Sequence, residues 1–343
     1  MFVRGRLRIY FVLSSVVFGI SVIAFSAPAT EFRVSLPPIM GSVPIALANG
    51  WGLFPKHEVD VQVIGLSDDQ ARSLALMAGN IDGMVCDLTT AILLYTAGTD
   101  IVITSTAYTP TQTGSLALLS QSFFNINSID DLLSRTEPGN SLKSIAITSM
   151  SNIEYDIDRL MEHLGYKIDP DKDYSYWHDL LQVATFLSLG SVYAAVLPEP
   201  YITYIANYPS VLKDSHLVHL SDFEGIDLLP SVVVFRRDFV NAHPDLVERF
   251  YDAYREAVER INSATKQELI DIGIDEALSL FFPGFPEEAV PEGIMDSFVI
   301  PHFPPPGMVP QAQYEDVIAW VNAKRYTWKH PEYEELTTDR FVK

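Results

Sequence analysis

Two stretches of the sequence match each other at an offset of 111 residues: AGNIDGMV at Ala78–Val85 and LGSVYAAV at Leu189–Val196. In each stretch a helix is expected to end at a glycine, and the chain then enters an apolar run, the pattern of a helix-to-strand turn. The same offset places Arg33–Leu36 on Ser144–Ile147. The match predicts two similar halves, although two unrelated turns of this common type would also produce it.

Short apolar runs alternate with helical patterns around these stretches, which is typical of an α/β fold with mainly parallel strands. In the first half we expect strands at Phe32–Leu36, Val59–Ile64, Ile81–Cys86 and Ile101–Ser105, with helices at Pro44–Asn49, Ser67–Gly79 and Thr89–Tyr95. Ligands of open α/β sheets bind beyond the carboxyl ends of the strands. Two facing lobes therefore predict a cleft lined by four loops, which follow Leu36, Val85, Ile147 and Val196.

Two further strand-like segments, Ser115–Ser120 and Ser231–Arg236, flank the second half on both sides. The chain is therefore expected to cross between the lobes twice, with a hinge at each crossing. The expected organisation is residues 30–117 as the first part of lobe 1, residues 118–233 as lobe 2, and residues 234–343 as the return to lobe 1 with the C-terminal helices.

The N-terminal segment, residues 1–29, has the three-part pattern of a secretory signal peptide. Three arginines precede the apolar run Ile9–Phe25, and small residues follow it. Cleavage after Ser26 and cleavage after Ala29 both fit, and an uncleaved anchor is the alternative because the run approaches the length that spans a bilayer. No cysteine stands directly after the run, which excludes a lipid-modified N-terminus. We expect a product that is soluble outside the cytoplasm.

The charge of the chain excludes several classes of protein. The sequence has 23 Lys and Arg against 44 Asp and Glu, a net charge of −21. Such a chain lacks the cationic surface that nucleic acids require and fits anionic membranes poorly. Its 48% of hydrophobic residues is ample for a folded core. Cys86, the only cysteine, can form no internal disulfide.

The sequence contains none of the catalytic motifs that we sought. GxSxG, GxxxxGK(S/T), HExxH and GxGxxG are all missing. Asp169–Asp173 resembles the start of a calcium loop, but Tyr174 and Leu180 stand where glycine and glutamate are required. We therefore expect a solvated turn there, and neither an enzyme, nor a metal, nor a cofactor.

A set of motifs in a fixed order carries a family resemblance. The motifs are Pro44–Ala48 followed by Gly52–Phe54, then Val59–Val61, Ala75–Gly83, Ala194–Tyr201 and Phe239–Val247. Together they resemble the extracytoplasmic substrate-binding proteins of the nitrate/sulfonate/taurine and thiamine-precursor class of ABC importers. The resemblance covers the chain from about Phe32 to the last forty residues.

The resemblance implies a type II periplasmic-binding-protein fold, in which two α/β lobes surround a cleft and two hinge crossings join them. It also implies a periplasmic monomer that closes on a small solute and delivers it to permease and ATPase subunits in the membrane. The enzymes nearest to this family are pyrimidine synthases with a cysteine cluster, which one cysteine and a signal peptide disfavour. A membrane-anchored sensor with the same fold is the third reading.

The candidate ligand-binding residues lie on the four loops and close to them: Pro38, Met40, Ser42, Cys86, Asp87, Thr89, Tyr108, Ser149, Ser151, Asn152, Glu199 and Tyr201. The four loops contain no basic residue, whereas Asp87 and Glu199 stand at strand ends of the two lobes. Carboxylates accept hydrogen bonds from ring amines, and tyrosines stack on flat rings or hold cations. We therefore expect a neutral or cationic heteroaromatic solute, such as a pyrimidine precursor of thiamine.

Other roles for these residues remain open. An oxoanion such as nitrate, a sulfonate or taurine would instead use the amides at Ser149–Asn152, which also have the pattern of a helix N-cap. Asp87 has the chemistry to cap the helix that opens at Thr89. Tyr108 fits the lining of a hinge, and Cys86 fits a small buried filler.

Overall fold

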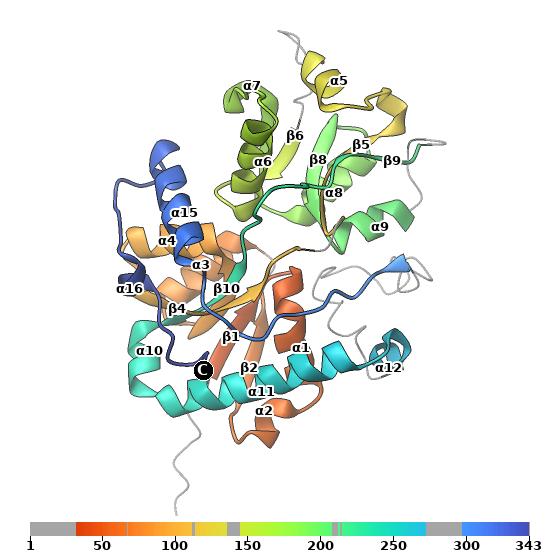
Figure 1. Ribbon diagram of the computed structural model, residues 1–343. Helices are drawn as coiled ribbons and strands as arrows, with labels where there is room; N and C mark the ends of the chain where they lie inside the picture. The colour runs from red at the N-terminus through yellow and green to blue at the C-terminus, as the bar shows by residue number, and fades with distance from the viewer. Residues whose placement is uncertain are drawn as a thin grey trace, which may run out of the picture. The chain divides into compact units, whose positions relative to one another are not determined.

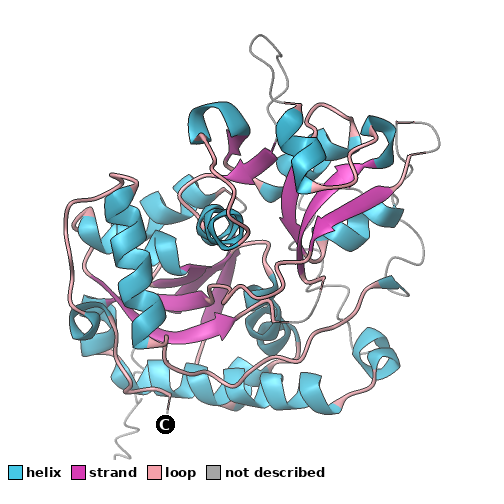
Figure 2. Cartoon of the chain, turned by 45° about the horizontal axis from the view of Figure 1, so that its top comes forward, coloured by secondary structure: helices cyan, strands magenta, loops and turns pink. Residues whose placement is uncertain are grey.

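The computed structural model describes residues 32–66, 68–111, 114–135, 145–207, 212, 215–271 and 297–342. The predicted signal peptide, residues 1–29, lies outside the described residues. Residues from 31 onward form one compact unit, which is built around two five-stranded sheets with helices packed against them (Figure 1; Figure 2). Among the described residues, no helix is long and apolar enough to span a bilayer.

The first sheet has the strand order β2-β1-β3-β10-β4. β1 (Phe32–Leu36) lies parallel to β2 (Val61–Gly65) and to β3 (Gly83–Asp87). β10 (Ser231–Arg236) lies antiparallel between β3 and β4 (Ile101–Tyr108). Most side chains of β1, β3 and β10 are buried, as expected of strands that are covered on both faces. We call the part of the chain around this sheet lobe 1.

The second sheet has the strand order β7-β6-β8-β5-β9. β6 (Ile145–Thr148) lies parallel to β7 (Tyr174–Trp177) and to β8 (Ala194–Pro198). β5 (Leu116–Gln121) lies antiparallel between β8 and β9 (Leu217–Ser221). The two sheets therefore have the same topology, three parallel strands followed by two strands that continue the sheet in mixed orientation. We call the part of the chain around the second sheet lobe 2.

The repeat found in the sequence is structural. Val34 pairs with Gly83 in lobe 1, and the residues 111 positions further along, Ile145 and Ala194, pair in lobe 2. In both halves the chain turns from helix to strand at a glycine in the left-handed region, with φ of 73° and 66°: Gly79 and Gly190. A chance match of two unrelated turns would not reproduce the register of the sheets, so the prediction of two similar α/β halves is confirmed.

The chain crosses between the lobes twice. β4 belongs to lobe 1 and β5 to lobe 2, so the chain makes its first crossing between Tyr108 and Leu116. β9 belongs to lobe 2 and β10 to lobe 1, so residues 222–230 form the second crossing. Both strands predicted at the crossings are present. Lobe 2 is an insertion between two neighbouring strands of the lobe 1 sheet.

Lobe 1 contains the short turn η1 (Met40–Ser42) and the helices α1 (Val43–Gly50), α2 (Leu53–Lys56), α3 (Asp69–Met77), α4 (Leu88–Thr96), α10 (Arg237–Ala242), α11 (Pro244–Ser263) and α12 (Lys266–Asp271). α11 runs along the lower side of lobe 1 in Figure 1 and buries Phe250 completely. The Phe250 ring lies 5.4 to 5.5 Å from the rings of Phe32, Phe54 and Phe235. The apolar face of this helix therefore forms core.

The N-terminus of α3 is capped by Asp68, whose carboxylate accepts a hydrogen bond from the Ala71 N–H at 2.7 Å. An acceptor at this position satisfies an N–H that has no partner within the helix. The predicted first residue of this helix, Ser67, lies outside the described residues.

Lobe 2 contains η2 (Ser122–Phe124), α5 (Ile129–Ser134), α6 (Asn152–His163), α7 (Pro170–Asp173), α8 (Leu180–Ser188) and α9 (Tyr201–Asn207). Ser151 caps α6, because its Oγ accepts a hydrogen bond from the Glu154 N–H at 3.2 Å. The segment predicted as a solvated turn, Asp169–Asp173, forms the one-turn helix α7 with Asp169 at its N-cap.

The C-terminal segment packs on lobe 1. α15 (Gln311–Ala323) lies beside α4 (Figure 1), and its buried Val317 and Val321 belong to the same apolar cluster as Ile92 of α4. After α16 (Tyr333–Leu336), Thr337 forms a parallel bridge to Ile103 of β4. The sequence did not predict this arrangement.

Candidate functional site

A cavity of about 110 Å³ is lined by residues of both lobes and of the crossings. Lobe 1 contributes Pro37, Pro38, Ile39, Met40, Gly41, Asp69, Arg72, Cys86, Asp87, Thr90, Tyr108 and Ser231. Lobe 2 contributes Leu116, Thr148, Asn152, Ile153, Asp156, His178, Asp179, Leu180, Pro198 and Glu199. The crossings contribute Pro110, Ser115 and Leu229.

The carboxyl ends of four central strands meet at this cavity. Pro37 follows β1, Asp87 ends β3, Thr148 ends β6 and Glu199 follows β8. Because parallel strands of one sheet end at the same edge, residues distant in sequence come together there. The predicted cleft with four lining loops is therefore confirmed.

Seven of the twelve predicted site residues line the cavity: Pro38, Met40, Cys86, Asp87, Tyr108, Asn152 and Glu199. The other five are not among the lining residues: Ser42, Thr89, Ser149, Ser151 and Tyr201.

Those five side chains and amides lie close behind the cavity wall. Ser151 caps α6, and the Ser149 N–H donates to the Trp177 carbonyl at 3.2 Å. Thr89 donates from N–H and Oγ1 to Oδ1 of Asn152, each at 3.3 Å. Tyr201 donates its hydroxyl hydrogen to the Pro38 carbonyl at 3.2 Å. Ser42 is fully buried.

Asp87 joins the two lobes. Its Oδ2 accepts a hydrogen bond from the Asn152 N–H, at the first residue of α6, at 2.9 Å. Its side chain makes no capping bond to its own helix α4, so the interpretation of Asp87 as the cap of that helix is wrong. The N-terminal end of a helix favours a negative charge, and a carboxylate of lobe 1 occupies this position on lobe 2.

Two buried carboxylates, Asp87 and Asp156, face the cavity from opposite lobes. Burial raises the pKa of Asp87, while the Asn152 N–H and the charge of Arg72 act in the opposite direction. Burial also raises the pKa of Asp156 well above its ordinary range; the Leu229 N–H lowers it, and the charge of Asp87 adds to the rise. Both carboxylates are therefore costly to ionise without a positive partner.

Glu199 has a structural role as well as a place in the cavity wall. Its two carboxylate oxygens accept hydrogen bonds from the N–H and the Oγ1 of Thr203, at 3.1 and 2.9 Å, in the first turn of α9. Burial raises the pKa of Glu199, and the bonds from Thr203 partly oppose that effect. Glu199 therefore caps its own helix and faces the cavity at the same time.

Arg72 brings a positive charge to the cavity that the sequence analysis missed. It comes from α3, not from one of the four loops, and is 3% exposed. Nη1 donates to the Leu66 carbonyl at 2.5 Å and Nη2 forms an ion pair with Asp69. Within the described part of the chain, Nε has no hydrogen-bond partner. The four loops themselves contain no basic residue, as the sequence analysis found, but the cavity wall includes this arginine from α3.

The sequence did contain an indication of Arg72. The buried residues of α3 are Arg72 and Leu76, which are four apart and so share one face of the helix. An arginine on the buried face of an amphipathic helix is unusual, because long charged side chains are rarely fully buried without a partner. Such a position points to a polar site inside the protein.

The loop after β7 also reaches the cavity, although it was not among the four predicted loops. It carries His178 and Asp179. Asp179 caps α8, since its Oδ1 accepts from the Leu181 N–H at 2.6 Å. Asp179, Asp69 and the three carboxylates already described make five acidic lining residues, against one arginine.

The wall of the cavity includes the Cys86 thiol. Burial and the neighbouring Asp87 raise the pKa of the Cys86 thiol, which makes it a poor nucleophile at neutral pH. Among the residues that the structure describes, no group of three or more His, Cys, Asp or Glu side chains is placed to hold a metal ion.

Two lobes of this topology, linked by two crossings around a shared cavity, define a periplasmic-binding-protein fold. No family model and no curated protein matches the chain. The solved structures that share the fold include the alkanesulfonate-binding protein SsuA from Xanthomonas axonopodis pv. citri bound to MOPS. It is 17% identical with a TM-score of 0.67, and the match covers 91% of this chain and 99% of that chain.

Two other solved structures are similar to the same extent. The periplasmic nitrate-binding protein NrtA from Synechocystis PCC 6803 is 13% identical with a TM-score of 0.66, over 92% of this chain and 87% of that chain. The ligand-binding component of an ABC-type import system from Staphylococcus aureus, with zinc bound, is 14% identical with a TM-score of 0.66, over 91% and 97%. At such low identity the likeness establishes the fold, and function has to be argued from the cavity.

Proposed function

We propose that this chain is the extracytoplasmic solute-binding component of an ABC importer. The observation that carries the proposal is the cavity, to which both lobes and both crossings contribute. A solute that contacts both lobes stabilises the closed arrangement by its higher affinity for that state. One of the similar solved structures is named as the ligand-binding component of an ABC-type import system and another as an alkanesulfonate-binding protein, which supports the same role.

We propose further that the solute is a small nitrogen heterocycle, neutral or cationic. The five carboxylates of the cavity wall belong to Asp69, Asp87, Asp156, Asp179 and Glu199, and among the described lining residues Arg72 alone supplies a fixed positive charge. A ring amine that donates to a buried carboxylate would relieve the cost of ionising it. A free anion would instead enter an acidic surrounding and be repelled.

The size and walls of the cavity limit the solute to a small molecule. Its volume is about 110 Å³, below the roughly 150 Å³ of a protein cavity that holds one benzene molecule. Pro37, Pro38 and Met40 of lobe 1 and Ile153 and Leu180 of lobe 2 supply apolar surface. Apolar walls with a few polar groups are typical of small-molecule sites.

The amides at the start of α6 already have partners within the protein. The Met150 N–H donates to Glu154 at 2.7 Å, and the Asn152 N–H donates to Asp87 at 2.9 Å. An oxoanion at this helix end would have to displace Asp87. The arrangement therefore favours a solute that is recognised by carboxylates.

An oxoanion is the second candidate, and Arg72 is the observation that favours it. Its buried Nε has no partner among the described residues, and guanidinium groups bind sulfonates and similar anions through directed hydrogen bonds. Two of the similar structures are named for alkanesulfonate and for nitrate. A solute with an amine and an acidic group would use both kinds of side chain.

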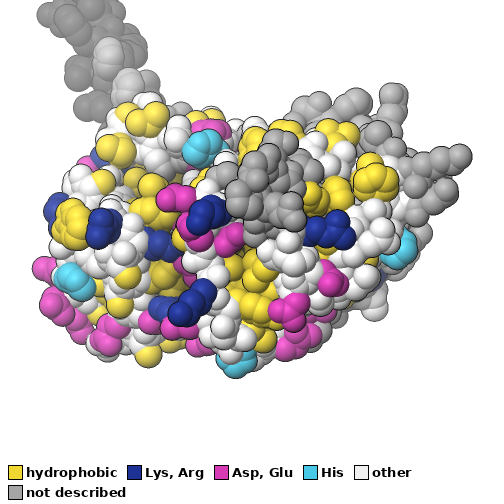
Figure 3. All heavy atoms as spheres, turned by 90° about the horizontal axis from the view of Figure 1, so that it is seen from above, with side chains coloured by type: hydrophobic (Ala, Val, Ile, Leu, Met, Phe, Trp, Pro, Cys, Tyr) yellow, Lys and Arg dark blue, Asp and Glu magenta, His cyan; other side chains and the backbone are white. Residues whose placement is uncertain are grey.

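We also propose export through the N-terminal signal peptide and delivery of the solute to permease and ATPase subunits by a monomer. On the face seen in Figure 3, acidic and basic side chains are interspersed with hydrophobic ones, so that face carries no single acidic docking surface. N-terminal sequencing of the exported protein tests the export step, because an N-terminus near Ala27 or Thr30 is expected.

The ligand class can be tested by isothermal titration of the purified chain, without its signal peptide, against single compounds. The panel is 4-amino-5-hydroxymethyl-2-methylpyrimidine, thiamine, riboflavin, nitrate, taurine and an alkanesulfonate. Each is titrated into the parent chain and into Asp87→Asn, Glu199→Gln and the control Glu248→Gln, whose position on α11 is exposed. We expect a heterocycle to bind the parent chain. At least one of Asp87→Asn and Glu199→Gln should lower its affinity roughly ten- to a hundredfold, because a hydrogen bond to a charged group is lost.

The outcomes separate the candidates. Binding of a heterocycle that both carboxylate variants leave unchanged removes these side chains from the site. Binding of an oxoanion alone, with no heterocycle, contradicts the proposed ligand class and supports the second candidate. The control variant should bind every compound as the parent chain does.

A further inference from the structure

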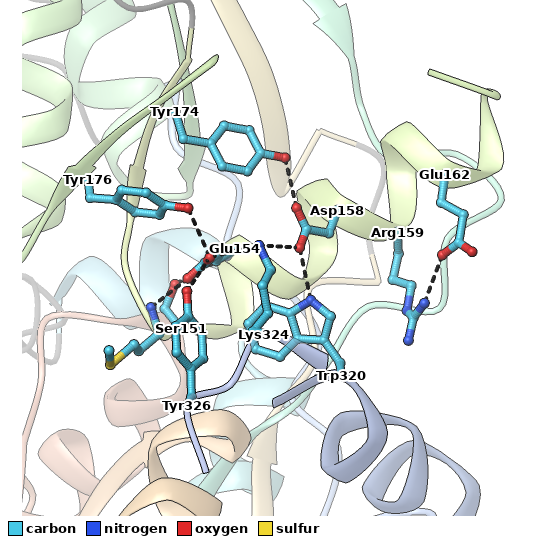
Figure 4. A network of polar contacts seen from close by, with 11 residues as sticks. Ser151, Glu154, Asp158, Arg159, Glu162, Tyr174, Tyr176, Trp320, Lys324 and Tyr326 are labelled. Carbon is cyan, nitrogen blue, oxygen red and sulfur yellow. Dashed lines mark hydrogen bonds and ion pairs between the residues drawn. The ribbon is translucent and has the colours of Figure 1, made fainter. Parts of the chain in front are cut away.

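The C-terminal segment contacts lobe 2 through a polar network shown in Figure 4. Nζ of Lys324 lies 2.8 Å from Oδ2 of Asp158 and 3.1 Å from Oε1 of Glu154, both on α6. Trp320 Nε1 donates to the same Asp158 oxygen at 2.9 Å, and the Tyr326 hydroxyl donates to the same Glu154 oxygen at 2.7 Å. We call these five residues the C-terminal latch.

The latch is largely shielded from water. The side chain of Glu154 is 0% exposed, that of Lys324 17% and that of Asp158 20%. The Lys324 ammonium also lies 5.5 Å from the ring of Trp320 and 5.8 Å from the ring of Tyr174. A cation between two carboxylates and two rings at this depth is held much more firmly than a surface ion pair.

Lobe 2 supplies further bonds to the two carboxylates of the latch. Tyr174 donates its hydroxyl hydrogen to Asp158 at 2.9 Å, and Tyr176 donates to Glu154 at 3.2 Å. Both tyrosines lie on β7, so these bonds do not depend on the position of lobe 1. Only the cation and the donors of the C-terminal segment would leave if the lobes moved apart.

The C-terminal segment belongs to lobe 1, so the latch joins the lobes at a place distinct from the two crossings. Val317 and Val321 of α15 are buried in the lobe 1 core, and Thr337 bridges β4. Hinge motion at the two crossings would separate Lys324 from both carboxylates of α6.

α6 connects the latch to the cavity. Asn152 and Asp156 line the cavity, whereas Glu154 and Asp158 carry the latch. Residues two apart on an α-helix point to nearly opposite sides, and residues four apart share a side. One helix therefore presents the face with Asn152 and Asp156 to the cavity and the opposite face, with Glu154 and Asp158, to the C-terminal segment.

We propose that the C-terminal latch is a closure device, which sets how much of the protein is closed before any solute binds. The proposal rests on the proposed function only in taking the closed arrangement as the one that binds. When the lobes part, Glu154 and Asp158 lose their cation, which opposes opening. The energy that solute binding has to provide for closure is smaller by the same amount.

The test compares Lys324→Met with the matched control Lys329→Met, an exposed lysine of the same segment. Both are measured in buffer without any solute. Small-angle X-ray scattering gives the radius of gyration, and exchange of the Trp320 indole hydrogen, followed by NMR of indole-labelled protein, reports the latch. We expect Lys324→Met to raise the radius of gyration and to speed the indole exchange at least about tenfold, because two buried carboxylates lose their cation. The control should match the parent.

A second variant covers the case in which Lys324→Met does not fold. Tyr326→Phe removes a single hydroxyl from Glu154 and should shift both readouts in the same direction by a smaller amount. If folded Lys324→Met and Tyr326→Phe both retain the parent's radius and exchange rate, the latch does not control closure and the proposal is overturned.

The latch and the proposed function can fail separately. The scattering and exchange measurements contain no solute, so a chain that opens on Lys324→Met supports the latch even if no compound of the panel binds. Conversely, a parent chain that binds a heterocycle while Lys324→Met remains closed supports the solute-binding function and overturns the latch.

Discussion

Replacement of Arg72 by methionine should stabilise the protein and weaken the binding of any solute that Arg72 contacts. Arg72 is 3% exposed, and its Nε has no partner among the described residues. Methionine has similar length and apolar character, so it can occupy the space of the aliphatic stem without a buried charge. An arginine that reduces the stability of the fold is best explained by a role toward the solute.

The magnitude follows from the pKa of the guanidinium. Burial lowers the pKa of Arg72 from 12.5 to about 10, although the negative groups around it, including Asp87, act in the opposite direction. A difference of this size corresponds to about 3 kcal/mol against the charged form in the folded protein. The lowered pKa of a base means that this cost is present in full below pH 10, hence also at pH 7. Loss of the bond to the Leu66 carbonyl and of the partly exposed ion pair with Asp69 offsets about 1–2 kcal/mol.

We therefore expect Arg72→Met to raise the free energy of unfolding by about 1–2 kcal/mol. Urea unfolding at pH 7, followed by circular dichroism, measures it, with unchanged slope as the sign that the denatured state is the same. The control is Arg249→Met, an arginine of α11 that donates to the Glu58 carbonyl at 2.9 Å and whose side chain is 41% exposed. Its effect should stay within about 0.5 kcal/mol.

A loss of stability in Arg72→Met of more than about 1 kcal/mol would refute this reasoning, because the buried charge would then be well compensated within the protein. Titration of the same variant with taurine, nitrate and the aminopyrimidine completes the test. An unchanged affinity for every compound that binds the parent would show that Arg72 does not contact the solute.

Two further variants test the interior. The pKa of Asp156 in the folded protein is raised well above its ordinary value of 3.8. As the pH rises above about 4, Asp156 therefore loses its proton in the unfolded chain before it does so in the folded protein, and the free energy of unfolding falls. Asp156→Asn should therefore gain stability relative to the parent between pH 4 and pH 8 in urea unfolding, and parallel pH profiles would contradict the buried-carboxylate account. Gly83→Ala would press a methyl group onto the Phe235 ring and the Val234 carbonyl, costing about 1–3 kcal/mol. Gly65→Ala, which has open space around it, should be nearly neutral, and an equal loss in both variants would exclude overpacking as the cause.

The sequence predicted those parts of the fold that depend on local pattern and on the repeat. Val34 pairs with Gly83 in lobe 1. The residues 111 positions further along, Ile145 and Ala194, pair in the same way in lobe 2. Register is specified strongly wherever one face of a strand is buried against a core, because a slip by one residue would move every side chain to the other face. The four loops at the strand ends follow from the same pattern.

The parts of the site that escaped prediction depend on which face a helix turns toward the cavity. Arg72 and Asp156 lie within helices, where a charged residue is normally solvated. The spacing of Arg72 from Leu76 is the one indication that Arg72 points inward, and nothing in the local pattern indicates it for Asp156. His178 and Asp179 follow β7, a strand that the sequence analysis did not locate. Whether Asp87 would bond within its own lobe or to α6 depends on the distance between the lobes, which no local pattern contains.

The position of β10 has a consequence for the order in which the protein can fold. β10 pairs with β3 and β4 of lobe 1, yet the whole of lobe 2 precedes it in the chain. During synthesis, β4 has no neighbour in its sheet until residue 236 has emerged, whereas lobe 2 already has all five of its strands. Long-range strand pairing is slow to form. The chain thus remains incompletely folded, with the edges of β3 and β4 unpaired, until two thirds of its length is available, a period in which a chaperone can hold it.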